Sequence, residues 1–418
     1  MEVKVLFWIL AILILLPFPP EWSFISYLLI THVDMSGPEW ASASGIGWEN
    51  ALKIVVLPTV LILRFRLREF PKVSKVFVLW IIFVMYMSIT SLWSPFPISG
   101  LKLIGYLYGH TATFIICMQM FSINKERVYK LTSWALWLSL VLAIVQTYLL
   151  GNPFGTSEQR FTSFSSPQSF AAWLTCALAI ILMGASSPKG FLSGTLISIV
   201  VLAGVILSGS NTMFTGALFV VAGWTFAKIL IKPSLVFIVQ LFALLSSLSI
   251  AIFYLPSANV RATRALSVLL TNELQLNDIG TFAWRLMIYQ RVLEEVRYSK
   301  SIQVLFGHGA SSGANLMVRF FGYDFATVDA NRVLHNEWLR IFYEGGIVGL
   351  FLFCLFLGAL IWIGLSSARR NRSSWPFLVI VPMLIGLLAV ENVLASAGNP
   401  MGIGLALILG AMAGGKGN

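Results

Sequence analysis

Long apolar stretches alternate with short polar connections along nearly the whole chain. Most of these stretches are close to the roughly 20 residues that a helix needs to cross about 30 Å of hydrocarbon. Backbone polar groups inside a membrane must be satisfied internally, which a helix achieves within one segment. The pattern therefore predicts an all-α fold, a polytopic membrane helical bundle of about twelve transmembrane helices with one large, partly helical loop.

The polar breaks give the boundaries of the expected spans. They place helices at residues 4–30, 51–64, 75–93, 101–121, 131–150, 168–185, 191–207, 212–230, 234–254, 337–366, 375–393 and 400–414. We expect one integrated membrane domain, with nine helices in residues 1–254, the large loop in residues 255–336 and three helices in residues 337–418. The first span, interrupted by prolines and followed by no small-residue cleavage site, is expected to remain uncleaved.

Composition and charge placement support this arrangement. Of 418 residues, 58% are hydrophobic and 11% charged, whereas a soluble domain carries roughly 25% charged residues. Lys and Arg gather in alternate connections, and the short connections at 31–50, 94–100, 208–211 and 394–399 hold none. Cytoplasmic loops retain basic residues. We therefore expect a bacterial inner-membrane protein with both termini cytoplasmic and the large loop periplasmic, surrounded by membrane lipids, with no nucleic-acid partner despite its net charge of +11.

Two connections on the periplasmic side break the charge pattern. Arg160 lies in residues 151–167, and several basic residues, including Arg261 and Arg264, lie in the large loop. Within that loop, residues 282–298 carry apolar side chains at helical spacing, namely Leu286, Tyr289, Leu293 and Val296, which predicts an amphipathic helix along the membrane surface. Its Arg285, Arg291 and Arg297 do not share one stripe. Each arginine either binds a ligand or snorkels to the lipid headgroups.

The polar residues at the end of the loop suggest chemistry without a metal or other cofactor. The chain lacks a Walker-type phosphate loop, HExxH, paired CxxC motifs and a periplasmic Asp-x-Asp. His335 lies at the water boundary of a predicted span, where it is either a general base or a histidine that pins the helix start. Asn336 fits a simple helix cap equally well. His32, His110 and His308 are interpreted as structural. Arginine grips diphosphate oxygens bidentately, and polyprenyl-diphosphate-linked sugars present such a group at this membrane face.

Four segments together are similar to one family. They are His335-Asn-Glu-Trp-Leu339 followed by Glu344-Gly-Gly-Ile-Val-Gly349, Arg285 before Leu305-Phe-Gly-His-Gly309, Arg160-Phe-Thr-Ser-Phe-Ser-Ser-Pro-Gln168, and Ser91-Leu-Trp-Ser-Pro95. Their order, spacing and residues resemble the O-antigen ligase and polymerase superfamily. Ser163 and Gln168 replace that family's usual Gly and Asn, and Asn211 stands where many relatives carry an arginine.

The resemblance implies a metal-independent inverting glycosyltransferase with a polyprenyl-diphosphate-linked glycan donor. His335 would be the catalytic base. Arg285 and Arg160, with Arg264 or Arg261 replacing the charge missing at Asn211, would bind the diphosphate, and Asn336 and Glu344 would support the site. The acceptor would be another lipid-linked glycan in a polymerase, slightly favoured, or the lipid A core in a ligase. A chain-length regulator would be a further partner. A small-anion transporter is the alternative of another class.

Overall fold

The computed structural model describes residues 56–64, 75–149, 167–184, 188–231, 281–321 and 336–370, with a few single positions that include Phe161, Leu334 and Leu394. In these ranges the regular structure is helical throughout. The elements are α4 (Leu57–Arg64), α5 (Lys75–Thr90), η3 (Ser91–Trp93), α6 (Pro97–Ile144), η4 (Val145–Leu149), α7 (Pro167–Gly184), α8 (Pro188–Ser208), α9 (Asn211–Ile231), α12 (Thr281–Tyr298), α13 (Ser301–Phe306), α14 (Gly313–Phe321) and α15 (Glu337–Arg370).

The described part of the chain contains helices that could span a membrane. Three segments, Lys75–Trp93, Pro97–Leu149 and Glu337–Ser366, are long and apolar enough to cross a membrane. Three shorter apolar helices, Phe170–Gly184, Gly194–Ser208 and Met213–Phe226, coincide with predicted spans. The all-helical prediction is confirmed. The spans predicted at 4–30, 234–254, 375–393 and 400–414 lie largely or wholly outside the described residues.

The predicted connection between residues 121 and 131 is wrong, because α6 is helical on both sides of one residue. Asn124 alone has a non-helical backbone, with φ −157° and ψ 87°. Its Oδ1 accepts a hydrogen bond from the backbone N–H of Arg127 at 2.9 Å. An asparagine in this relation caps the start of a helix. The polar run around Lys125 therefore joins two helices at a capped kink instead of forming a loop.

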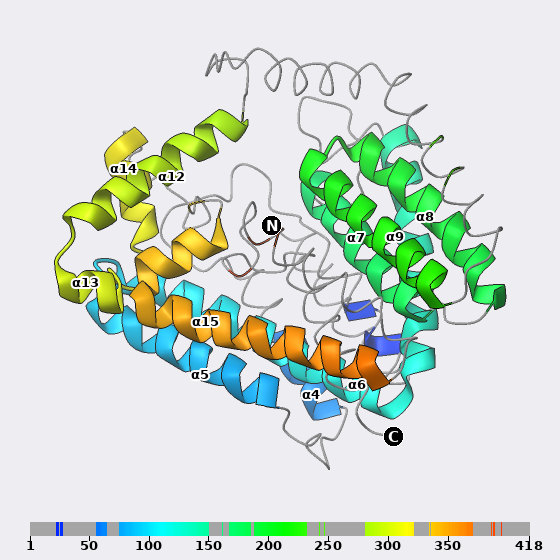
Figure 1. Ribbon diagram of the computed structural model, residues 1–418, viewed down its shortest axis with the longest axis horizontal. Coiled ribbons are helices and arrows are strands. Elements are labelled where there is room, and N and C mark those ends of the chain that lie inside the picture. The colour runs from blue at the N-terminus through cyan, green and yellow to red at the C-terminus, as the bar shows by residue number, and fades with distance from the viewer. Residues whose placement is uncertain are drawn as a thin grey trace, which may run out of the picture.

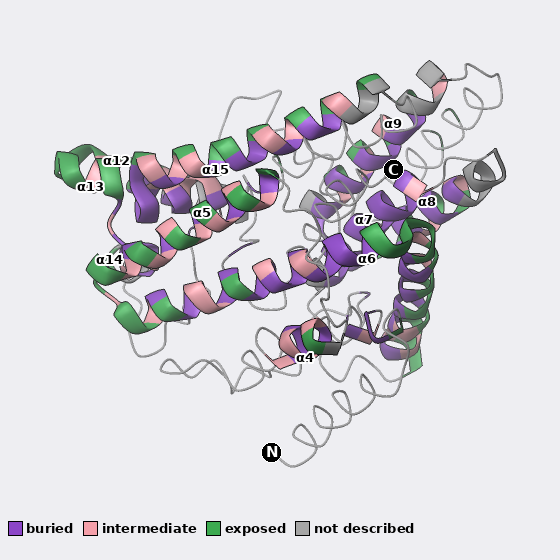
Figure 2. Ribbon diagram, turned by 90° about the horizontal axis from the view of Figure 1, so that it is seen from below, coloured by how far each residue is buried: buried purple, intermediate pink, exposed green. Residues whose placement is uncertain are grey.

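Helices α5 and α15 lie side by side, as Figure 1 shows. Trp80 and Phe83 of α5 contact Phe356 and Phe353 of α15, with ring centroids 5.1 and 5.2 Å apart. The opposite side of each helix leaves apolar residues exposed at helical spacing, namely Val78, Ile82, Met85 and Ile89 on α5 and Ile347, Phe351 and Leu355 on α15 (Figure 2). Apolar stripes of this length in a helix pair are typical of surfaces that face lipid.

The described helices gather into two further groups. Helix α7 packs against α6, α8 and α9 and is buried on all sides, and Trp173 donates a hydrogen bond to Ser139 Oγ at 3.1 Å across to α6. Helices α12, α13 and α14 lie together beside the start of α15, at the end of the molecule away from α7, α8 and α9 (Figure 1). This end carries most of the segments singled out in the sequence.

Candidate functional site

Helix α15 contains a kink at Gly346, where φ is 66° and ψ −166°. The kink divides α15 into a short helix, residues 337–345, and a long helix, residues 347–370 (Figure 1). Only glycine adopts this backbone conformation readily. A Cβ at Gly346 would also overlap the carbonyl of Leu305 and the amide of Gly307. The helix predicted over 337–366 is therefore present, with a kink at Gly346 that the sequence pattern does not indicate.

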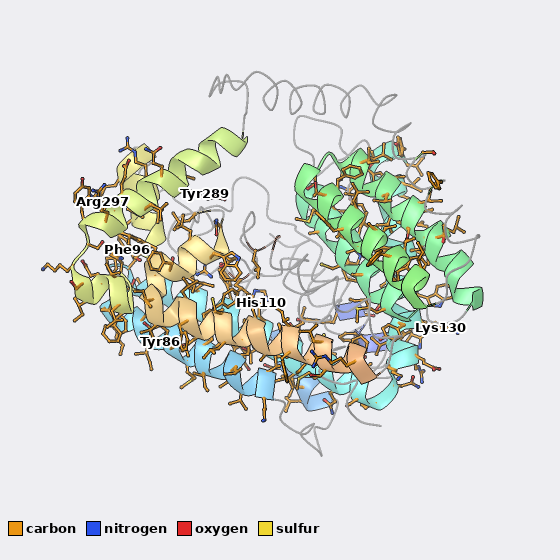
Figure 3. The ribbon with its side chains drawn as sticks, viewed as in Figure 1. Tyr86, Phe96, His110, Lys130, Tyr289 and Arg297 are labelled. Carbon is orange, nitrogen blue, oxygen red and sulfur yellow. The ribbon has the colours of Figure 1, made fainter. Side chains whose placement is uncertain are left out.

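A kinked helix leaves carbonyl groups without their usual partners, and here each is satisfied from another part of the chain. The amide of His308 donates to Tyr343 O at 2.9 Å, and the amide of Gly309 donates to Glu344 O at 3.1 Å. The hydroxyl of Tyr86 on α5 donates to Gly345 O at 2.7 Å (Figure 3). The turn at 305–309 and α5 thus hold the short helix at its angle.

The turn at 305–309 can approach this backbone because of Gly307. Its φ is 83°, and any Cβ there would overlap the backbone of Glu344 and Gly345. Two glycines from distant segments, Gly307 and Gly346, therefore pack backbone against backbone. Close approach of this kind is a common reason for glycine at a fixed position.

The segment Ser91–Pro95 joins the same contact region. Ser94 Oγ donates to the carbonyl of Ala310 at 2.6 Å. Ser311 Oγ donates to the carbonyl of Ser99, at the start of α6, at 2.8 Å. Three of the four segments that carry the family resemblance, from residues 91–95, 305–309 and 336–349, are thus packed on one another.

The short helix carries a buried cluster of charges, of which only Glu344 was among the predicted site residues. Arg340 is 1% exposed. It donates two hydrogen bonds to Glu337 Oε2, from Nε at 2.8 Å and from Nη2 at 2.5 Å. A third hydrogen bond runs from Nη1 to Glu344 Oε2 at 2.9 Å. Both carboxylates are buried as well. We name Glu337, Arg340 and Glu344 the charge cluster. Their spacing of three and four residues places them on one helix face. This spacing is the sequence pattern from which the cluster could have been predicted.

The charge cluster connects to α6 through Leu394. The amide of Leu394 donates to Glu337 Oε1 at 2.8 Å, and its carbonyl accepts a hydrogen bond from the ring of His110. His110 is buried within α6, and its Nε2 has no hydrogen-bond partner among the residues that the structure describes. His110, interpreted from the sequence as structural, lies beside the network that anchors the short helix.

His335 itself lies outside the described residues, but both of its neighbours are described. Leu334 is fully buried and packs with Ile288 and Val292 of α12, Leu316 of α14 and Tyr343. Asn336 Oδ1 accepts the amide of Leu339 at 3.0 Å, the bond of a helix cap. Asn336 therefore has the capping role that the sequence left open, and Glu344 belongs to the charge cluster.

The structure describes the side chain of none of the arginines predicted to bind the diphosphate. Arg160, Arg261 and Arg264 lie outside the described residues. Arg285 lies in α12 one turn before Ile288, and Asn211 is the first residue of α9, but neither side chain is described. Nothing in the structure tests whether these residues meet. In the described part of the chain, no three His, Cys, Asp or Glu side chains are gathered so as to hold a metal ion.

The helix predicted at 282–298 is present as α12, and its predicted apolar face is found in part. Tyr289 and Val296 pack beside the buried Ile288 and Val292, whereas Leu293 is 55% exposed. The reason is that α14 and the start of α15 cover the Ile288 side, and the sequence pattern alone does not indicate on which side they pack. Arg291 and Arg297 are both exposed.

His308 has a structural position. Its ring stacks on Tyr343 at a centroid distance of 4.2 Å, Nδ1 lies 3.2 Å from Tyr343 O, and Nε2 lies 2.8 Å from Ser299 Oγ. Burial lowers the pKa of His308 below its ordinary value, although the Tyr343 carbonyl and the Glu295 carboxylate oppose this effect. The neutral ring thus joins α12 and the turn at 305–309 to the short helix.

Comparison with known proteins adds no family assignment. No protein-family model matches the chain, and no curated protein is significantly similar to it. The class that the fold supports is an all-helical membrane protein, with a charged and glycine-rich site where α15 begins. Its function is inferred below from the site and from the motifs.

Proposed function

We propose that this protein is a membrane glycosyltransferase that moves an oligosaccharide from polyprenyl diphosphate to an acceptor glycan at the periplasmic face of a bacterial inner membrane. The single observation that carries the proposal is the contact among segments 91–95, 305–309 and 336–349. These segments are far apart in the sequence, and each resembles a motif of the O-antigen ligase and polymerase superfamily. Their packing on one another supports one shared site instead of unrelated local likenesses.

In the proposed reaction, His335 accepts the proton of the acceptor hydroxyl. The hydroxyl oxygen attacks the anomeric carbon of the donor sugar, a new glycosidic bond forms, and the bond to the diphosphate oxygen breaks. The polyprenyl diphosphate leaves with the bonding electrons. Arg285 and Arg160 bind the diphosphate and stabilise its growing charge. A single displacement inverts the anomeric configuration, and the mechanism requires no metal or other cofactor.

The two described neighbours of His335 both have defined contacts. Leu334 is buried and Asn336 caps the short helix, while the charge cluster ties that helix to Leu394. A general base must stay within hydrogen-bond reach of the proton that it accepts. We infer that the charge cluster contributes by positioning, because its one cation is already paired with two carboxylates.

Between polymerase and ligase, we slightly favour polymerase, for which the acceptor is another lipid-linked glycan. The reasons are the Trp-Ser-x-x-Pro-like element at Ser91–Pro95 and the asparagine at position 211. A ligase, with the lipid A core as acceptor, is the alternative. The profile of surface polysaccharide in a deletion strain separates them, since a polymerase mutant keeps single repeats on lipid A and a ligase mutant loses them.

A small-anion transporter is the second candidate, and one observation favours it. Lys102 and His110 are buried within α6, and the charge cluster is buried in the short helix, so the spans are less free of charge than the sequence suggested. Buried ionisable residues at membrane depth are typical of transport pathways. Unchanged glycans in the deletion strain, with anion uptake lost from vesicles, would favour this candidate over the enzyme.

The test is His335→Ala, expressed in the deletion strain and compared with wild type at equal membrane abundance. We expect glycan transfer to fall at least about a hundredfold, the usual contribution of a general base. Arg297→Gln is the control, because it removes an exposed side chain from the same large loop, and it should retain transfer. Wild-type transfer by His335→Ala would overturn the proposed mechanism.

A further inference from the structure

Helix α13 carries large apolar side chains that the described part of the chain leaves exposed. Ile302, Leu305 and Phe306 are 65%, 42% and 41% exposed. Their spacing of three and four residues places them on one side of the helix, which we name the apolar face of α13. No residue of α13 is buried (Figure 2). An apolar surface of this kind is costly in water and indicates a partner that is itself apolar.

The apolar face of α13 continues the apolar stripe of α5. The hydroxyl of Tyr86 donates a hydrogen bond to the carbonyl of Phe306 at 3.1 Å. Met85 and Ile89, which border Tyr86 on the surface of α5, are exposed members of that stripe. The stripe then extends into η3, where Leu92 is 84% exposed. The surface of α5 that is suited to lipid therefore runs directly onto α13.

A second contact joins α13 to the apolar stripe of α15. A Cβ at Gly346 would overlap the carbonyl of Leu305, and the next residue, Ile347, is the first exposed residue of the α15 stripe. Helix α13 thus lies where the stripes of α5 and α15 end (Figure 1). A lipid layer that covers both stripes would reach α13 without interruption.

The contact with Tyr86 also sets the depth of α13. The segment Lys75–Trp93 has 19 residues, which extend over about 28 Å, close to the thickness of roughly 30 Å of the hydrocarbon layer. Tyr86 lies seven residues before Trp93, about 10 Å along the helix axis. Side chains on a helix lean toward its N-terminus, which here is away from Trp93. Phe306, held by the Tyr86 hydroxyl, therefore lies below the end of this segment and not above it in water.

The residues that precede the apolar face of α13 are typical of a membrane boundary. Tyr298 is 84% exposed, and Lys300, which directly precedes α13, is exposed as well. Tyrosine is enriched where lipid headgroups meet hydrocarbon. A lysine covers apolar surface with its stem while its ammonium group stays among the headgroups. Lipid fits this surface better than a soluble protein, which could not reach the depth of Phe306.

We propose that α13 is a lipid anchor, whose apolar face, together with Leu92, enters the boundary between headgroups and hydrocarbon in the leaflet on the side of η3. This contact is additional to the membrane-surface position predicted for residues 282–298. Helix α13 leads into the turn at 305–309, which supplies hydrogen-bond donors to the short helix. The anchor thereby holds the candidate site at a fixed height relative to a lipid-linked donor. This consequence rests on the proposed function, whereas the lipid contact itself does not.

Photocross-linking of the full chain, in vesicles of phosphatidylethanolamine and phosphatidylglycerol, tests the anchor. The photoreactive residue p-benzoylphenylalanine replaces Ile302 in one protein and Leu305 in a second, and mass spectrometry identifies lipid adducts. Phe351, on the α15 stripe, is the positive control position, and Gln290, an exposed polar residue of α12, is the negative one. We expect at least about tenfold more lipid adduct at Ile302 than at Gln290, in line with the transfer of one large aliphatic side chain out of water.

Two results would overturn the anchor. The first is a yield of lipid adduct at Ile302 and Leu305 no higher than at Gln290. The second is cross-linking of both positions to another copy of the chain in place of lipid, because the apolar face would then be a protein interface. Neither result depends on glycan transfer. If lipid adducts form but His335→Ala transfers glycan like wild type, the anchor stands and the proposed function fails.

Discussion

Removal of Arg340 should be among the most damaging single changes in the described chain. Arg340→Met deletes three charge-assisted hydrogen bonds and leaves Glu337 and Glu344, 0% and 1% exposed, without their cation. Removing one partner from a buried ion pair costs about 3–5 kcal/mol, because the remaining charge is buried and uncompensated. Glu337 keeps the amide of Leu394, which compensates only part of its charge.

A companion variant separates charge from packing. Replacing the whole charge cluster, with Glu337→Gln, Arg340→Met and Glu344→Gln together, leaves no buried charge. Neutral replacement of such clusters is often harmless or even stabilising by about 1–4 kcal/mol. The triple variant should therefore be much more stable than Arg340→Met alone, although it contains two further substitutions.

Thermal unfolding of the purified protein, followed by intrinsic fluorescence, measures this difference. Arg319→Met is the matched control, because Arg319 has an equally short ion pair of 2.8 Å with Glu295 but is exposed, and exposed pairs contribute only about 0–1 kcal/mol. We expect the melting temperature to fall strongly for Arg340→Met and little for Arg319→Met. A triple variant as unstable as Arg340→Met would refute the argument from uncompensated charge.

Two further predictions concern the kink and His308. Gly346→Ala should lower the melting temperature and reduce glycan transfer, because the backbone conformation of Gly346 costs other residues about 1–3 kcal/mol and the added Cβ would overlap the turn at 305–309. The control is Gly358→Ala on the same helix, which should be harmless because no atom lies within 4 Å of the added Cβ. Equal effects of the two substitutions would contradict the role of the kink. The lowered pKa of His308 means that protonation favours the unfolded chain, so stability is complete above pH about 6.5 and falls as the pH drops below it. Melting temperatures at pH 7.5 and 5.5 should differ more for wild type than for His308→Gln, and an unchanged difference would contradict this assignment.

The sequence predicted those elements that depend on local pattern. The spans at 75–93 and 191–207 follow from uninterrupted apolar residues, and the helix at 282–298 follows from its periodicity. The segments around Ser94, Gly307 and Gly345 were also recognised as important from their motifs. These features are encoded within stretches of a few to about twenty residues.

The remaining features depend on partners that are distant in sequence. The kink at Gly346 forms because Gly307 and Tyr86 occupy the space and supply donors, and a glycine pair in an apolar run does not by itself indicate a break. The burial of Arg340 likewise depends on contacts that reach Leu394 and His110.

The hydrogen bonds at the kink have a consequence for protein engineering. Since the amides of His308 and Gly309 complete the end of the short helix, residues 305–309 are part of the scaffold and not an exchangeable loop. A chimera that imports the large loop of a relative to alter its choice of acceptor should also import residues 343–349 and the matching segment around Tyr86. A graft limited to the loop would deprive the carbonyls of Tyr343 and Glu344 of their present donors.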